Sequence, residues 1–297
     1  MDVHEYVGEA RLYLDNAAAL IGKLRKRGLR ILDKIPSLPI ITEDTNCILL
    51  LYRDSIAHVD AFEQLSRLPS VEGMQIVLRT FFESKCLLEY ILDSDTKRRA
   101  IAYQTNYLMK RIRTYEQFDQ STEHGKQTQA QLRKDRLFGG APVLQDLDAS
   151  DAIANIRSQL DREPYSSLEK ELSRKGMKHW YSIDDGPKSF QELCRRLNYP
   201  AAYELLYRRW SGTAHSETAY ADSFFADRES KEGRVLGLRA IKGYRAVFDL
   251  AFPLMCDYLS RVTEKLIPSE YERFARFYKN VLKPFRESRL ESVTLAE

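Results

Sequence analysis

The sequence predicts an all-α protein, a multi-helix bundle of about eight to ten helices. Apolar residues recur at spacings of three and four, which is the helical period, and no segment shows the alternating pattern of a convincing strand. Glycine and proline number only 13 and 10 in 297 residues, and they gather at a few places. These observations favour helices joined by short connections, in a single helical domain over residues 1–297.

Four helices are predicted at the start of the chain, over residues 3–32, 45–68, 70–94 and 95–118. The third has apolar side chains in almost every direction around its axis, which is typical of a central, buried helix. The hydroxyl of Ser94 can accept a backbone N–H bond, so we expect Ser94 to cap the fourth helix.

The remainder of the chain alternates polar segments with helices. Residues 120–149 are polar and read as an insertion or excursion that holds at most one short exposed helix, and residues 217–233 read as a polar loop. Further helices are expected over residues 152–172 and 189–197, from Pro200 through His215, and over residues 236–266 and 269–290.

Composition and targeting signals exclude several classes of protein. The 46 basic and 43 acidic side chains leave a formal charge of +3, too small to indicate a nucleic-acid surface, so any such surface must be local. The four cysteines show no paired spacing and are expected to be free, buried thiols. No signal peptide and no apolar run of about 20 residues is found, which favours a cytoplasmic protein without a membrane span. No cofactor motif or metal-binding spacing is present.

One polar constellation interrupts the later helices. Arg208, Ser211 and His215 share one face of a straight helix, because each residue turns about 100° around the axis. Arg209 falls on another side, so helical phase favours Arg208 as the partner of His215. A neutral imidazole, a guanidinium and a hydroxyl are able to cleave RNA without a metal, with an internal 2′-hydroxyl as nucleophile. Such a centre would not cut DNA.

Arg208, Ser211 and His215 also have a purely structural interpretation. Three of the five histidines have an arginine five to seven positions before them, so the spacing by itself carries almost no weight. An arginine near a histidine also marks hydrogen-bonded helix junctions. Arg53 and His58 form a second candidate pair with the same weakness.

A charged pair lies on the predicted central helix. Arg79 and Glu83 are one turn apart, and burial of charge is costly unless it is paired, so they should bond to each other or to a neighbouring helix. A structural ion pair is one interpretation. In the functional one, Glu83 orients His215 or Arg208, and Arg79 binds a phosphate. Arg99 and Tyr103 form a similar stripe on the fourth helix.

Several of the residues named above resemble the pattern of a known family. The stretch around Arg79 and Glu83, followed by Trp180, Tyr203, Tyr207, Ser211 and His215, resembles an uncharacterised bacterial family, the domain of unknown function of type 5677. In that family an Arg, three residues and Glu, and later a Ser, three residues and His, are the recurring polar positions. The resemblance spans roughly residues 51–220.

The later motif also resembles the HEPN superfamily of helical-bundle ribonucleases and toxins, whose mark is an Arg, four to six residues, then His. The resemblance implies a HEPN-like core with peripheral helices, in which Arg208 or Arg209 pairs with His215. That superfamily often has Asn, Asp or His directly after the Arg, a detail that Arg53 fits better. It further implies a homodimer with facing motifs, and a role in phage defence or a toxin and antitoxin pair.

The hypothesis is therefore a metal-independent HEPN-like ribonuclease or toxin that acts on RNA, with His215, Arg208, Ser211, Arg79 and Glu83 in its centre. The alternative is a non-catalytic helical interaction or scaffold module, in which the same Arg, Glu and His side chains only lock helices together.

Overall fold

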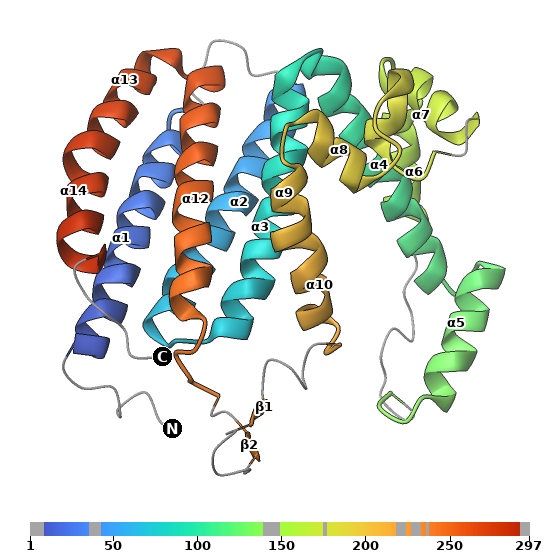
Figure 1. Cartoon of the computed structure of the whole chain (residues 1–297). Helices are drawn as coiled ribbons and strands as arrows, with labels where there is room; N and C mark the ends of the chain where they lie inside the picture. The colour runs from blue at the N-terminus through green and yellow to red at the C-terminus, as the bar shows by residue number, and fades with distance from the viewer. Residues whose placement is uncertain are drawn as a thin grey trace. The chain divides into compact units, whose positions relative to one another are not determined.

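The structure, a computed structural model, describes residues 9–35, 43–138, 149–174, 177–217, 224–226, 233–235 and 238–291. It confirms the all-α prediction (Figure 1). The chain divides into two compact units: unit 1 comprises Met1–Ser94 and Gln191–Glu297, and unit 2 comprises Asp95–Phe190. The single domain expected over residues 1–297 stays a prediction.

Unit 1 is built on four long helices that pack side by side (Figure 1). Their bounds are α1 Glu9–Leu32, α2 Glu43–Arg67, α3 Val71–Asp93 and α12 Tyr244–Leu266. The first three agree with the predicted helices within a few residues at every described end. Helix α12 begins later than the predicted residue 236, and Gly243, with a φ of 78°, directly precedes it. This left-handed conformation favours glycine and ends the incoming loop there.

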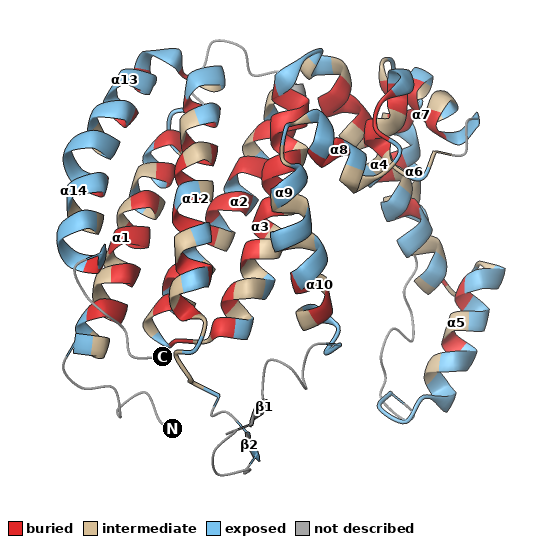
Figure 2. Ribbon diagram, viewed as in Figure 1, coloured by how far each residue is buried: buried red, intermediate tan, exposed pale blue. Residues whose placement is uncertain are grey.

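The core of unit 1 lies between these four helices, whose buried faces are red in Figure 2. Tyr258 of α12 shows how they meet: its ring stacks on Tyr52 of α2 at 5.9 Å and meets the edge of Phe81 of α3 at 5.3 Å. Helix α3 buries residues along its whole length, which confirms the prediction of a central helix.

A series of short helices follows unit 2 in the sequence, and two of them, η4 and α10, lie along α3 (Figure 1). They are α8 Phe190–Arg196, α9 Pro200–Ala202, the π-helical segment η4 Tyr203–Arg208, and α10 Arg209–Ala214. Pro200 occupies the first turn of α9 as predicted, because its missing N–H is not needed there. The π-helical segment was not predicted.

Most of the predicted loop over residues 217–233 lies outside the described residues. Two short antiparallel strands occur here: β1 Phe224–Ala226 falls within the predicted loop and β2 Gly233–Val235 begins at its last residue, with Phe224 opposite Val235. The sequence predicted no strand here. Three residues per strand are too few to show an alternating pattern.

The end of unit 1 is one helical run with π-helical interruptions. It comprises α13 Pro268–Phe277, η5 Tyr278–Leu282, α14 Lys283–Arg286 and η6 Glu287–Glu291. This run corresponds to the predicted helix over residues 269–290. Its outer face is exposed, as the pale blue of α13 and α14 shows (Figure 2).

Unit 2 contains α4 Thr96–Phe118, α5 Glu123–Lys134, α6 Ser150–Leu160, α7 Tyr165–Arg174 and the short helix η3 Trp180–Asp185. The cap predicted at Ser94 is wrong: Asp95 precedes α4, and Ser94 ends α3. The helix predicted over residues 152–172 is two helices, with Pro164 between them. Helix α5 falls in the predicted insertion, of which residues 139–148 lie outside the described part.

Two further predictions concern the whole chain. Cys47, Cys86, Cys194 and Cys256 are buried and form no disulfide in the described part of the chain, as expected. In the described part of the chain, every helix is too short or too polar to cross a membrane.

Candidate functional site

The predicted residues on α3 meet the short helices η4 and α10 along one line of contact. The guanidinium carbon of Arg79 lies 4.4 Å from the centre of the Tyr207 ring, and Thr213 Oγ1 donates a hydrogen bond to Gln75 Oε1 at 3.2 Å. Residue numbers fall along α3 as they rise along η4 and α10, so the segments run antiparallel. We call this line, formed by Gln75, Arg79, Glu83, Tyr207 and Thr213, the α3/α10 seam.

Arg79 is half-buried in the seam, and its guanidinium lies over the ring of Tyr207 in a cation–π contact. Its Nε is buried and has no hydrogen-bond partner among the described residues. The predicted ion pair between Arg79 and Glu83 is not found among the described residues. The guanidinium therefore keeps hydrogen-bonding capacity that the described protein groups do not use.

Glu83 is also half-buried, and no described residue donates a hydrogen bond to it. Burial raises the pKa of its carboxyl group above the ordinary value, while the charge of Arg79 opposes the shift. Burial, and then the charge of Glu83, raise the pKa of the Tyr207 hydroxyl. Arg79, Glu83 and Tyr207 thus form one electrostatic group, as expected for the first two and not foreseen for the third.

The later constellation lies toward the end of the seam and is open to solvent. Arg208 and His215 are exposed and Ser211 is half-buried. Arg208 Nη1 pairs with Glu204 Oε2 at 3.1 Å, whereas no described side chain bonds to the imidazole of His215. The structure does not join Arg208, Ser211 and His215 by any side-chain hydrogen bond within the residues it describes.

The π-helical segment η4 qualifies the argument from helical phase. A straight helix with 3.6 residues per turn is found only over Arg209–Ala214 of this stretch, which is α10. Arg208 is the last residue of the wider π-helical turn, and His215 ends α10 with a φ of −104° and a ψ of 11°. Arg209 is exposed like Arg208, so exposure does not distinguish the two arginines.

The second candidate pair lies on α2. Arg53 is exposed, whereas His58 is largely covered, and His58 Nδ1 lies 3.9 Å from Asp54 Oδ2. This separation is too long for a hydrogen bond, and Nδ1 is buried without one in the described structure. Neither residue contacts the seam through a bond that the described structure contains.

Arg99 and Tyr103 belong to unit 2. Arg99 is buried, and the ring of Tyr103 meets the edge of Trp180 at 5.4 Å. The Tyr103 ring therefore packs against η3 within its own unit. The stripe on α4 and the charged pair on α3 lie in different units.

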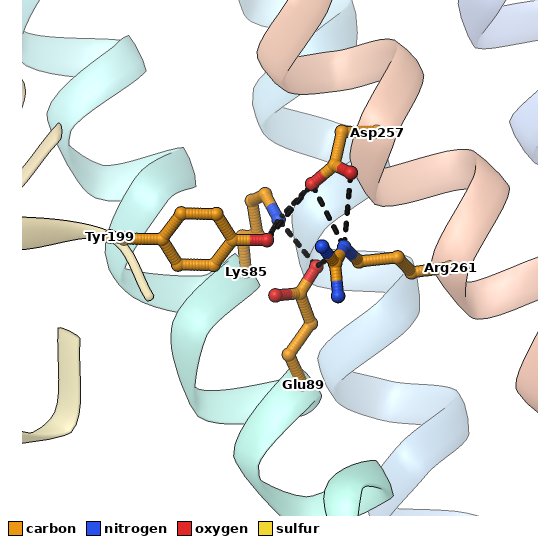
Figure 3. Close-up of polar contacts among 5 residues, drawn as sticks. All are labelled: Lys85, Glu89, Tyr199, Asp257 and Arg261. Atoms are coloured by element: carbon orange, nitrogen blue, oxygen red, sulfur yellow. Dashed lines mark hydrogen bonds and ion pairs between the residues drawn. The ribbon is translucent and has the colours of Figure 1, made fainter. Parts of the chain in front are cut away.

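A second polar cluster on α3 was not predicted, and Figure 3 shows it. Lys85 is fully buried; its ammonium donates to Glu89 Oε1, to the Tyr199 hydroxyl at 2.8 Å and to Asp257 Oδ2 at 2.7 Å. Arg261 donates to Asp257 Oδ1 at 3.0 Å. We call these five residues the Lys85 cluster. It connects α3, the residue before α9, and α12.

The positive and negative side chains of the Lys85 cluster compensate one another, as in a structural network. Burial acts to raise the pKa of Asp257, but Lys85, Arg261 and Tyr199 overcome it and lower that pKa overall. Burial raises the pKa of Glu89 in spite of Lys85. The four-residue spacing of Lys85 and Glu89 on an apolar helix was a signal as strong as that of Arg79 and Glu83, whereas Asp257 is 172 positions away and gave none.

Two further observations concern the nature of the site. The described residues bring together no group of three or more His, Cys, Asp or Glu able to hold a metal ion. Residues 45–232 match the model of a family of unknown function (DUF5677), and this span contains the whole seam and His215. No curated protein and no solved structure matches the sequence.

Proposed function

The chain belongs to DUF5677, a family of unknown function, and we propose that the α3/α10 seam and the end of α10 form the centre of a HEPN-like, metal-independent ribonuclease. One observation supports it most: the side chains of Arg79 and Glu83 lie in the seam without a hydrogen bond to any described protein group. Side chains that only lock helices together are bonded to those helices, as Lys85 is.

The chemistry follows from the residue types. Neutral His215 takes the proton of an RNA 2′-hydroxyl while its oxygen forms a bond to the adjacent phosphorus. The bond from phosphorus to the 5′-oxygen breaks, and that oxygen takes a proton from water. The products are a 2′,3′-cyclic phosphate and a 5′-hydroxyl.

The arginines supply positive charge for the phosphate. Arg208 is exposed and its pair with Glu204 is a surface ion pair, worth about 0–1 kcal/mol, so a phosphate can replace Glu204 at little cost. Ser211 supplies a hydroxyl donor on the same stretch of helix. Arg79 binds a neighbouring phosphate of the strand, and its charge acts on the nearby Glu83 carboxyl group.

The test compares wild type with His215→Ala on labelled single-stranded RNA in the presence of a chelator. We expect cleavage by wild type with a cyclic phosphate end, loss of at least about 100-fold in the variant, and no cleavage of DNA. His124→Ala is the matched control, because His124 is an exposed histidine of unit 2. Equal cutting by wild type and His215→Ala, or no cutting under any condition, would contradict the proposal.

Stability gives an independent readout of the same variant. His215 is exposed and has no described side-chain partner, so His215→Ala should change the free energy of unfolding by no more than about 0.5 kcal/mol. A loss of several kcal/mol would instead indicate a structural histidine.

A non-catalytic interaction module is the second candidate. One observation favours it: a general base is usually oriented by a third group, and no described side chain bonds to His215. Under the ribonuclease proposal, a second copy of the chain supplies that orientation across a shared cleft, so the active protein is a homodimer. Light scattering on the purified chain measures the oligomeric state. The same proposal includes an antitoxin partner and a part in phage defence.

A further inference from the structure

A hollow of about 520 Å³ lies at one end of unit 1, between the last turns of α1 and the first turns of α13. Ile31 contributes apolar surface to it, and the remaining lining residues are charged: Arg27, Arg30, Asp33, Lys34, Glu270 and Arg273. In Figure 1 this is the end of the bundle at which α12 passes into α13. These residues lie outside the span that matches the family, so the family match does not cover them.

Glu270 holds the cationic side chains around this hollow. Its side chain is only 8% exposed, and its carboxylate pairs with Lys34, with Arg27 Nη2 at 3.2 Å and with Arg273 Nη1 at 2.8 Å. The hydrogen bond from Lys34, together with Arg273, lowers the pKa of Glu270 to about 2. The carboxylate therefore remains charged at neutral pH and fixes three cations that would otherwise repel one another.

The hollow still has more positive than negative charge, with four cationic side chains against two carboxylates. Arg30 is exposed and forms no ion pair with any residue that the structure describes. Arg27 Nε is buried and has no hydrogen-bond partner in that same part of the chain. The excess of positive charge, with Arg30 exposed and unpaired among the described residues, favours an anionic ligand.

We propose that this hollow binds a small molecule that carries a phosphate group. Its volume lies within the range of about 300–1,000 Å³ that is typical of small-molecule sites. Guanidinium groups present planar pairs of donors that match phosphate oxygens, and Arg27, Arg30 and Arg273 supply three of them. A phosphate group carries a charge of about −1.5 to −2 at pH 7, which matches the excess of positive charge in the hollow.

The test is isothermal titration calorimetry of the full chain at low ionic strength, with pyrophosphate and with adenosine triphosphate as probes. We expect both to bind to wild type, and Arg30→Ala to weaken binding about tenfold, the effect of one lost charge-assisted hydrogen bond. Arg30 has no described partner in the fold, so this variant should fold normally. Arg273→Ala should also weaken binding, with circular dichroism as the check on its folding.

Arg276→Ala is the matched control, because Arg276 is exposed on α13, the helix of Arg273, and does not line the hollow. It should leave the affinity unchanged. Equal weakening by Arg276→Ala and Arg30→Ala would mean a general basic surface and would overturn the proposal. Absence of binding at millimolar probe, or binding of single-stranded RNA through Arg30 without binding of pyrophosphate, would overturn it as well.

Discussion

Two glutamates on α3 show at the residue scale how surroundings set the role of a side chain. Burial raises the pKa of both Glu83 and Glu89. Glu89 bonds to Lys85 inside the core, whereas Glu83 has only the charge of Arg79 nearby and no described hydrogen bond. Glu89 is therefore committed to structure, and Glu83 remains available to a ligand.

The Lys85 cluster should account for much of the stability of unit 1. Lys85→Met leaves Glu89 and Asp257 without their shared cation, and breaking a buried pair from one side costs about 3–5 kcal/mol. Urea denaturation of the variant measures this loss. The double variant Lys85→Met with Glu89→Met should recover part of it, since no uncompensated charge then remains at position 89. A single variant as stable as wild type would contradict a structural role.

Glu270 predicts a dependence of stability on acid. Its folded pKa of about 2 lies below its ordinary value of 4.5, so its contribution is present above pH 4.5 and is lost as the pH falls toward 2. Glu270→Gln should therefore destabilise the protein at pH 7, and the difference from wild type should vanish near pH 2. Unfolding measured over a pH series checks this. Glu272→Gln, at an exposed position of the same helix, should show no such convergence.

At the residue scale, two of the five seam residues could be predicted from the sequence as a charged pair. Arg79 and Glu83 stand out because charges are rare on an apolar helix, and both do lie close to another charged or polar group. The contact with Tyr207 depends on how α3 and η4 pack, which periodicity does not encode. The Lys85 cluster was not predicted, because Tyr199 and Asp257, which bond to Lys85, come from distant parts of the chain.

At the scale of elements, long periodic helices were predictable and their interruptions were not. Helices α2 and α3 agree closely with the sequence pattern because each buries a continuous apolar face. The π-helical segment η4 carries no sequence mark, since one extra residue in a turn leaves composition unchanged. The same lack of a local signal explains the two short strands.

The turn between α4 and α5 gives a test at this scale. A Cβ added at Gly125 would lie 1.7 Å from the backbone oxygen of Asp119, which cannot move without opening the turn. That turn is closed by Thr122, whose hydroxyl donates to Asp119 O and accepts from Gly125 N.

Gly125→Ala should therefore lower the stability of unit 2 by about 1–3 kcal/mol, although helix propensity alone favours Ala by about 1 kcal/mol. Thermal unfolding followed by circular dichroism measures the sign. Gln127→Ala, at an exposed position of the same helix, should be neutral or slightly stabilising. A stabilised Gly125→Ala would show that the turn tolerates the extra carbon.

At the scale of the whole molecule, all of unit 2 lies between two parts of unit 1 in the sequence. Composition and helical period predicted the all-α class, because these are properties of the chain as a whole. The division into two units follows from which helices pack together. No glycine or proline marks the junction at Ser94, and only the pair Gly186 and Pro187 lies near the junction at Phe190.

This arrangement has a consequence during synthesis on the ribosome. Tyr13 of α1, Tyr52 of α2 and Phe81 of α3 all pack against rings of α12, which is translated only after the whole of unit 2. Unit 2 can be complete while the first three helices still expose the apolar faces that α12 will cover. The nascent chain thus passes through a stage with one finished unit and one unfinished core, and this is the stage at which it is most exposed to aggregation and most in need of a chaperone.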